Sequence, residues 1–371
     1  LILFSIYGFS KRYFNSQIGL IAVAIFLSFP LTTNLITTAS TDLGATLFFA
    51  LSLFSFLIYM ENRKVNWLLL ASVFAGFTAG TKLQPIFLII SLGGLYLIKI
   101  LIDTEWRNKR EFLLWISFGL LAILIASPWY IKNFIQTGNP VYPFFYSLFG
   151  GSNWSSALSV LQESNILKKA PGYDLETFLI APWRFTVQSA SFGDLGFFFL
   201  AFLPMAIIVR KSRWLSINIL GLAIIYYPLW FFFLFQRNRH WIELAPALAI
   251  IVAIILITLL RKDYFIKYSK YVISSIFSLA LILGVGISII YNSKFIPVVS
   301  GLEDRNTFLT EHGYIYEPYI FANQNLPETS KVLVYNVWDM TYYLDVDYVI
   351  GNPLIQGLID YSTLSSTEEL I

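Results

Sequence analysis

The sequence contains no cysteine and only two histidines among its 371 residues. Without cysteine there is no disulfide framework and no thiolate chemistry. His240 and His312 have no second histidine nearby, so a His/Cys metal centre is not expected, and each more simply makes an interfacial hydrogen bond. A Walker lysine motif and a glycine-rich phosphate loop are also missing, and the Gly93-Gly94 pair predicts a helix-packing contact instead.

Charge is scarce as well. Only 13% of the residues are charged, about half the usual fraction of a soluble protein, whereas 57% are hydrophobic and the mean hydropathy is +0.68. Apolar runs near the ~20 residues that cross the hydrocarbon of a bilayer recur along the chain. They predict membrane spans near residues 17–33, 42–60, 66–80, 84–102, 111–129, 192–209, 214–235, 241–260 and 271–291.

The gaps between these runs alternate in charge: basic gaps alternate with gaps that are long or contain few basic residues. One set of gaps carries 15 of the 25 Lys and Arg residues but only five of the 22 Asp and Glu residues, a net charge of +10. This is the positive-inside pattern, so these gaps are expected on the cytoplasmic side. Only Lys82 and Pro85 separate residues 66–80 from 84–102, and if the two runs formed one span, every later loop would change side.

Two regions are expected outside the bilayer, both on the extracytoplasmic side. One is a long loop over residues 130–191, and the other is the more acidic tail over residues 292–371. In the tail, alternating residues predict strands at 331–337 and 346–350, with a short helix at 319–326. The predicted fold is an all-α polytopic membrane protein of about nine to ten transmembrane helices, with a membrane domain at 1–291 and a small α/β extracytoplasmic domain at 292–371.

Both ends of the sequence are predicted to be cut. Leu1 to Phe9 is apolar but too short to span the bilayer, and it runs into the basic pair at residues 11 and 12, so it is interpreted as the second half of a helix. Residues 365–369 resemble a helix N-cap shortly before the last residue. We therefore expect the sequence to be part of a longer protein.

A small set of polar residues lies at the predicted outer ends of the spans. Each has a simple explanation alone: Asp42 and Asp194 as helix caps, Lys82 extending to the interface, and Arg237 and Arg239 anchored to lipid headgroups. The outer face disfavours Lys and Arg in short loops, however, so their coincidence there indicates a site. The cations suit a phosphate or pyrophosphate and the apolar surroundings a lipid tail, which predicts an amphiphile with an anionic head.

The stretch ASPWYIKNFIQTGNPVYP at residues 126–143 ends a span with aromatic residues and then turns at Gly138-Asn139-Pro140. This pattern resembles the loop entry of bacterial membrane glycosyltransferases of the C-type fold, which include relatives of protein O-mannosyltransferases and of the aminoarabinose transferase that modifies lipid A. Further stretches are similar to the same family in the same order. They are the helix start at Asp42, GTKLQP around Lys82, FGDLGFFFLAFLP at 192–204, RNRHWIELAPALAI at 237–250, and KVLVYNVWDMTYYLD and NPLIQGLIDYSTLSSTEEL in the tail.

The resemblance implies an enzyme that moves a sugar from a polyprenyl-phosphate donor to a lipid, glycan or protein acceptor on the extracytoplasmic face of the plasma membrane, with inversion. It implies that Asp42 is the second-loop acid and that Lys82, Arg237 and Arg239 bind the donor phosphate. His240 stands where the family usually has Tyr, which leaves the register of the two arginines open. A possible acceptor or sugar site comprises Asp194, Arg184, His240 and Asn139, and Trp154, Tyr173 and Trp183 in the long loop are candidate stacking surfaces for sugars.

The resemblance also implies that the main catalytic base lies upstream of Leu1, so the chain alone is expected to be inactive. No cofactor is indicated. The need for a divalent metal stays open, because oligosaccharyltransferase-like relatives use one and mannosyltransferase-like relatives generally do not. Three other interpretations remain: a secondary transporter or flippase of sugar-lipid substrates, a lipid-linked glycan polymerase or ligase, and a membrane scaffold. A transporter would be expected to have ionisable residues near the bilayer midplane, whereas here they lie at the ends of the spans.

Overall fold

The computed structural model describes residues 1–38, 40–187, 199, 202–207, 213–234, 236–261, 269–313, 315–335, 341–352 and 354. The chain forms two compact units. The first comprises Leu1–Tyr130 and Lys169–Asn292, and the second comprises Ile131–Lys168 and Ser293–Ile371. Most of the predicted span at 192–209, the predicted site residue Asp194 and the cap at 365–369 lie outside the described residues.

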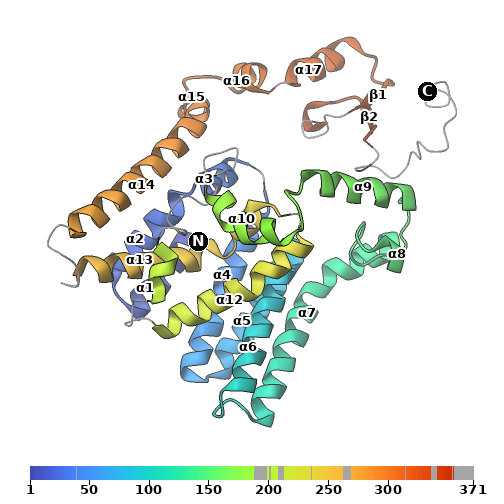
Figure 1. Ribbon diagram of the computed structural model, residues 1–371. Coiled ribbons are helices and arrows are strands. Elements are labelled where there is room, and N and C mark those ends of the chain that lie inside the picture. Colours follow the sequence, from blue (N-terminus) through green and yellow to red (C-terminus); the bar gives the residue numbers. More distant parts are fainter. Residues whose placement is uncertain are drawn as a thin grey trace. The chain divides into compact units, whose positions relative to one another are not determined.

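The first unit is helical (Figure 1). Its α-helices are α1 (Ile2–Tyr13), α2 (Ser16–Leu27), α3 (Pro30–Thr37), α4 (Asp42–Asn62), α5 (Val65–Thr81), α6 (Ile86–Ile102), α7 (Lys109–Thr137), which continues into the second unit, α10 (Leu175–Val187), α12 (Arg213–Phe233), α13 (Ala245–Arg261) and α14 (Ser269–Asn292). Two 3₁₀-helices are η1 (Leu203–Ile207) and η3 (Asn238–Trp241).

Several of these helices are long and apolar enough to cross a bilayer. Within the described residues these are α4, α7, α12 and the stretch Lys270–Ser300 that contains α14, and the bent pair α2 and α3 adds a fifth candidate. Helices α5 and α6 and the segment Ala245–Leu260 are apolar but shorter. The predicted helical fold with several helices long and apolar enough to cross a bilayer is therefore present, while the number of nine to ten spans stays a prediction.

The predicted span at 17–33 is not one straight helix. Helix α2 ends at Leu27, α3 begins at Pro30, and the two axes are bent by 69°. Proline has no backbone N–H to donate and disfavours a helical conformation of the residue before it, which is extended Phe29 here. Pro30 therefore bends the predicted span.

Residues 66–80 and 84–102, whose separation decides the side of every later loop, do form two helices. Helix α5 ends at Thr81, Lys82 is extended, and Pro85 caps the start of α6. Helices α4, α5 and α6 pack against one another, as Figure 1 shows. The turn between α5 and α6 therefore places Lys82 at the same end of the bundle as the first residue of α4.

Helix α7 is longer than predicted, because it continues through Pro128 to Thr137 instead of ending at residue 129. A proline inside a helix leaves the carbonyl four residues earlier without its usual donor. Here that carbonyl belongs to Leu124, and the Ser127 hydroxyl donates to it at 2.8 Å. The serine thus offsets part of the destabilisation that the proline causes. The aromatic residues at 129–130, which were predicted to end the span, therefore lie within α7.

The core of the first unit surrounds α13, whose residues from Ala245 to Ile255 are almost fully buried. By contrast, the most apolar 18 residues of α7 are only 17% buried, and those of the stretch Lys270–Ser300 are only 11% buried. Such apolar helix surfaces are stable where hydrocarbon covers them. We therefore assign the exposed faces of α7 and α14 to the lipid, and α13 to the interior.

The second unit contains α8 (Tyr146–Phe149), α9 (Ser156–Lys169), α15 (Ile296–Ser300), α16 (Arg305–His312), α17 (Tyr316–Asn325), β1 (Lys331–Val334) and β2 (Asp347–Ile350). The strands pair in parallel, with Lys331 opposite Asp347. Tyr319 of α17 and Val334 of β1 pack together in a small apolar core with Leu344 and Val346. The predicted mixed α/β character of the tail is thus present at the predicted positions, each strand being shorter than expected.

Candidate functional site

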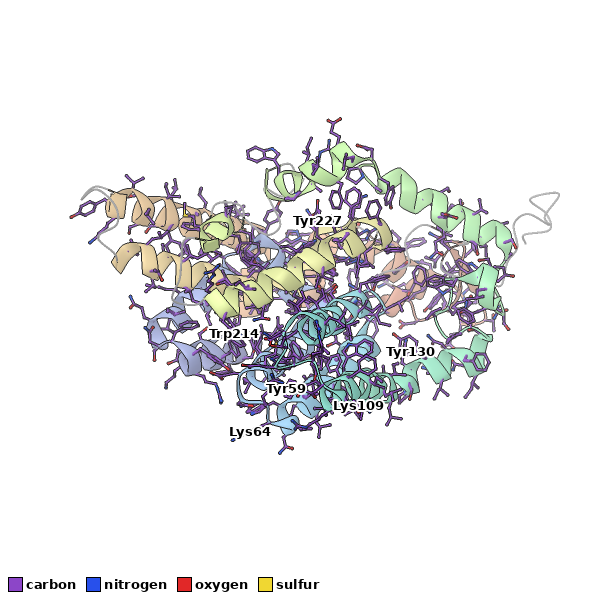
Figure 2. All side chains as sticks on the ribbon, turned by 60° about the horizontal axis from the view of Figure 1, so that its bottom comes forward. Tyr59, Lys64, Lys109, Tyr130, Trp214 and Tyr227 are labelled. Carbon is purple, nitrogen blue, oxygen red and sulfur yellow. The ribbon has the colours of Figure 1, made fainter. Side chains whose placement is uncertain are left out.

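Two charged clusters lie at opposite ends of α4. Because a helix rises 1.5 Å per residue, the 21 residues of α4 separate them by roughly 30 Å. The inner cluster surrounds Glu111 at the basic end of the bundle, which Figure 2 turns forward with Lys64 and Lys109 labelled. The outer cluster surrounds Asp42. The comparison of the two identifies the candidate site.

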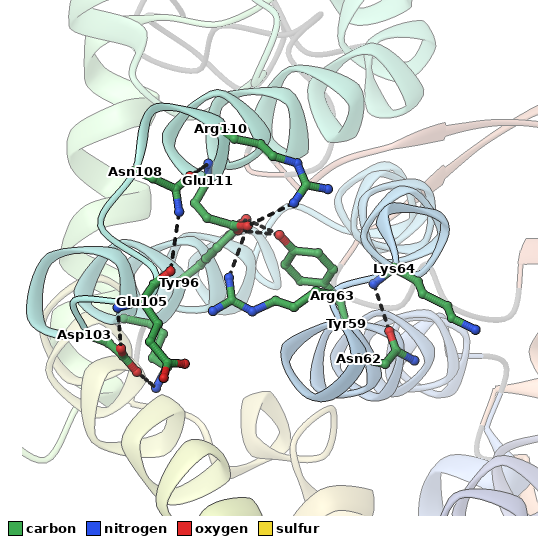
Figure 3. A network of polar contacts seen from close by, with 11 residues as sticks. Tyr59, Asn62, Arg63, Lys64, Tyr96, Asp103, Glu105, Asn108, Arg110 and Glu111 are labelled. Atoms are coloured by element: carbon green, nitrogen blue, oxygen red, sulfur yellow. Dashed lines mark hydrogen bonds and ion pairs between the residues drawn. The ribbon is translucent and has the colours of Figure 1, made fainter.

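The inner cluster is fully partnered (Figure 3). Glu111 is 1% exposed. Its carboxylate accepts hydrogen bonds from the hydroxyls of Tyr59 and Tyr96, the latter at 2.9 Å, and pairs with the Arg63 guanidinium at 3.1 Å. The Arg63 guanidinium also stacks 3.1 Å from the centre of the Trp106 ring. These contacts join the ends of α4, α6 and α7, and such a satisfied network specifies packing and leaves few groups for a ligand.

The outer cluster begins with an ion pair. Asp42, which is 2% exposed, accepts hydrogen bonds from the Lys82 ammonium and from the Ser40 hydroxyl. Thr41 is the N-cap of α4 and Asp42 is the first residue of the helix, one position later than a cap. The Lys82 side chain is only 13% exposed and points to Asp42 instead of extending to the interface. The structure therefore brings together the predicted acid and the predicted phosphate-binding lysine.

The short helix η3 brings a second cation to this cluster. Tyr226 of α12 donates to the His240 carbonyl at 2.7 Å, and Trp230 donates to the Arg237 carbonyl at 3.1 Å, which fixes the backbone of η3. Arg239 interacts electrostatically with Asp42, whereas the Arg237 side chain is exposed. Of the two arginines whose register the sequence left open, Arg239 is thus the one whose charge acts on Asp42.

Several buried polar atoms at this end have no hydrogen-bond partner among the described residues. They include the Gln84 side-chain oxygen, Nε of Arg239, both ring nitrogens of His240, and both carboxylate oxygens of Glu243. Burial, together with Lys82 and Arg239, lowers the pKa of His240 to about 3, so this imidazole is neutral at physiological pH.

The remaining predicted residues belong to other elements. Arg184 is in the last turn of α10. In the second unit, the Asn139 amide donates to the carbonyls of Phe144 and Gly150 and its oxygen accepts from the Val141 N–H, so this side chain shapes its own loop. Of the candidate stacking residues, Trp154 is buried, Tyr173 packs against Phe231 and Trp183 is exposed.

The sequence analysis did not include Glu243 or Ser40 in the site. A glutamate four residues after Arg239 and inside an apolar run was the available signal. Within the described residues, no group of three His, Cys, Asp or Glu side chains is arranged to hold a metal ion.

Residues 1–131 match the family described as dolichyl-phosphate-mannose-protein mannosyltransferase. No curated protein matches the sequence significantly. Among solved structures, the chain is similar to ArnT from Cupriavidus metallidurans bound to undecaprenyl phosphate, with a TM-score of 0.56 and 13% identity over 96% of this chain and 71% of that one. At this identity the likeness shows the fold. The resemblance to C-type membrane glycosyltransferases is thereby confirmed, by the family match in residues 1–131 and by the fold over most of the chain.

Proposed function

We propose that this protein is an inverting membrane glycosyltransferase that takes its sugar from a polyprenyl-phosphate donor at the extracytoplasmic face. The observation that carries the proposal is the buried Asp42–Lys82 pair with Arg239 beside it. It lies in the fold of a family whose members act on such donors, and Asp42 and Lys82 both fall within the matched residues 1–131. ArnT, which shares the fold, was solved with a polyprenyl phosphate bound.

The two cations suit the charge change of the reaction. A sugar joined to a polyprenyl phosphate is a phosphodiester with one negative charge, and its departure leaves a phosphate monoester on which a second charge develops. Groups that stabilise the developing charge lower the barrier more than groups that bind the ground state equally well. Lys82 and Arg239 would supply this stabilisation, with Arg237 as a further cation nearer the surface.

Asp42 has two roles in this proposal. Its carboxylate fixes the Lys82 ammonium while the site waits for substrate, because the ion pair and the Ser40 hydroxyl hold both side chains in one geometry. When the donor phosphate arrives, Lys82 can share its three N–H donors between the phosphate and Asp42. Asp42 then accepts a hydrogen bond from the acceptor and thereby helps to orient it.

An apolar groove next to Asp42 suits the lipid part of the donor. The groove has a volume of about 390 Å³ and is lined by residues of α1, α2, α3 and α4, including Leu43, Gly44 and Leu47 in the first turns of α4. A hydrocarbon chain gains ~0.8 kcal/mol for each CH₂ group that it buries. A polar cluster beside an apolar groove is the surface that an amphiphile with an anionic head requires.

The proposed topology places the basic gaps, including Lys64, in the cytoplasm, and the long loop and the tail outside. These 371 residues contain no cysteine, so single cysteines introduced into them report the side of the membrane on which they lie. Lys64→Cys is expected to resist a membrane-impermeant thiol reagent in intact cells, whereas Ser164→Cys in α9 is expected to react. Labelling of Lys64→Cys from outside would contradict this topology.

The catalytic proposal is tested by sugar transfer from a polyprenyl-phosphate donor in nanodiscs that contain the full-length protein. Lys82→Ala and Arg239→Ala are expected to lose transfer by ~10²-fold or more, and Arg237→Ala to lose less because its side chain is exposed. Lys64→Ala, a cation at the other end of α4, is the matched control and is expected to keep full activity. Full activity of both outer variants would refute the site.

A further inference from the structure

The outer cluster contains a buried acidic side chain, Glu243, which has no role in binding a phosphate anion. Glu243 is 2% exposed, and neither of its carboxylate oxygens has a hydrogen-bond partner among the described residues. A buried polar group without a partner costs ~1–3 kcal/mol, and more if it is charged. Among the described residues, the buried Glu243 carboxylate thus lowers stability, as expected for a group whose hydrogen bonds are completed by a ligand.

A capping role does not explain this residue. Glu243 precedes α13, but the first amides of that helix are already bonded by backbone carbonyls: Ala245 to Ile242, and Ala247 and Leu248 to Leu244. Glu243 instead lies in the turn between η3, which carries Arg239, and the start of α13, and the charges of Lys82, Asp42 and Arg239 all act on its carboxylate. It thus belongs to the same charged end of the bundle as the proposed phosphate-binding cations.

The unused atoms define the chemistry of that group. Glu243 offers two acceptor oxygens and Gln84 offers a third, and the unused donors at the same end include Nε of Arg239, Nε1 of Trp241 and one ring nitrogen of the neutral His240. Such a site matches a ligand that carries an anion next to a group with several hydrogen-bond donors and acceptors of its own, as hydroxyl groups are. A phosphate followed by hydroxyl or ammonium groups, as in a phosphate-linked sugar, has this pattern, whereas a bare lipid phosphate supplies only the anion.

We infer that Glu243, assisted by Gln84, binds the donor groups of the sugar that is attached to the polyprenyl phosphate. This inference rests on the proposed function and deepens it, since it divides the site into a phosphate part, Lys82 and Arg239, and a sugar part, Glu243 and Gln84. Glu243 binds substrate in this account, and its carboxylate takes no part in bond making or breaking.

The two parts can be separated by binding measurements on the full-length protein in nanodiscs. Three probes are used: undecaprenyl phosphate, undecaprenyl-phosphate mannose, and an undecaprenyl phosphate that carries an aminopentose. Lys82→Ala is expected to weaken binding of all three. Glu243→Leu is expected to keep or improve the affinity for undecaprenyl phosphate and to lose about tenfold for at least one sugar-bearing lipid, a loss typical of one buried hydrogen bond.

The conservative variant identifies the sugar chemistry. Glu243→Gln keeps one acceptor oxygen but not the negative charge. If the group that Glu243 binds is an ammonium, this variant is expected to weaken binding of the aminopentose-bearing lipid strongly and binding of the mannose-bearing lipid only slightly. Glu243→Leu is also expected to raise the thermal melting temperature, because it removes an unpartnered carboxyl. A residue that only supports the fold would lower it.

Each outcome is decisive. Equal losses for bare and sugar-bearing lipids in Glu243→Leu would overturn the inference while leaving the proposed function in place, since the residue would then act through the phosphate. Unchanged binding of every probe in that variant would likewise overturn the inference. If wild-type protein does not bind undecaprenyl phosphate, the proposed function fails, and this inference fails with it.

Discussion

Glu111 and Glu243 are both almost completely buried, and they differ in what surrounds them. Glu111 accepts hydrogen bonds from two tyrosines and pairs with Arg63, whereas no described residue donates to either side-chain oxygen of Glu243. A satisfied buried carboxylate stabilises a packing arrangement, and an unsatisfied one costs stability. The difference indicates that one end of α4 is built for stability and the other for a ligand.

The comparison predicts that changes at the outer end affect activity most. Lys82→Met removes the ammonium while keeping a long apolar stem, and it is expected to lower the rate of sugar transfer by ~10²–10³-fold. Activity of the purified full-length protein in nanodiscs measures this. Arg63→Met, which removes the corresponding cation from the inner cluster, serves as the control and should lose thermal stability with little change in the rate per folded molecule.

Changes at the inner end are expected to affect stability next most strongly. Glu111→Ala leaves Arg63 and two tyrosine hydroxyls without their shared partner, and loss of one member of a buried ion pair costs ~3–5 kcal/mol. Unfolding in mixed detergent micelles measures the change. Arg110→Ala is a matched control, because this exposed side chain lies 3.8 Å from Glu111 and contributes little. Similar stability of the two variants would contradict a structural role for Glu111.

The smallest expected effect is a loss of stability when one hydrogen bond is removed from the inner cluster. Tyr96→Phe removes one of the hydrogen bonds to Glu111, at 2.9 Å, while keeping the ring and the second tyrosine. The expected destabilisation is ~1–2 kcal/mol. The same unfolding assay measures it, with Tyr13→Phe, whose exposed hydroxyl bonds Glu61, as the control. A loss in Tyr96→Phe as large as in Glu111→Ala would mean that the network acts as one unit.

Much of this organisation could be predicted from the sequence, because hydrophobic length and charge patterning act along the chain. The division between α5 and α6 at Lys82 and the strands of the tail follow from such local signals. The residues Asp42 and Lys82 could be chosen because both are charges at the outer ends of spans. That they form a buried ion pair depends on the packing of α4 against α5, which no local pattern specifies.

The failures have the same origin. Pro30 breaks a predicted span and Pro128 does not break another, because the Ser127 hydroxyl compensates only the second. Glu243, which opens the apolar run after Arg239, was not among the predicted site residues. Its unusual state becomes visible only when its neighbours in space are known, since a missing hydrogen-bond partner has no signature in the sequence.

The most direct test of the central claim measures the affinity of the full-length protein for undecaprenyl phosphate in two variants. Each variant lacks one cation, either at the inner or at the outer end of α4. Native mass spectrometry of protein in nanodiscs can compare wild type, Arg63→Met and Lys82→Met at equal lipid concentrations. We predict that Arg63→Met binds like wild type and that Lys82→Met loses tenfold or more. Equal affinities in all three proteins would contradict the assignment of the outer cluster as the phosphate site.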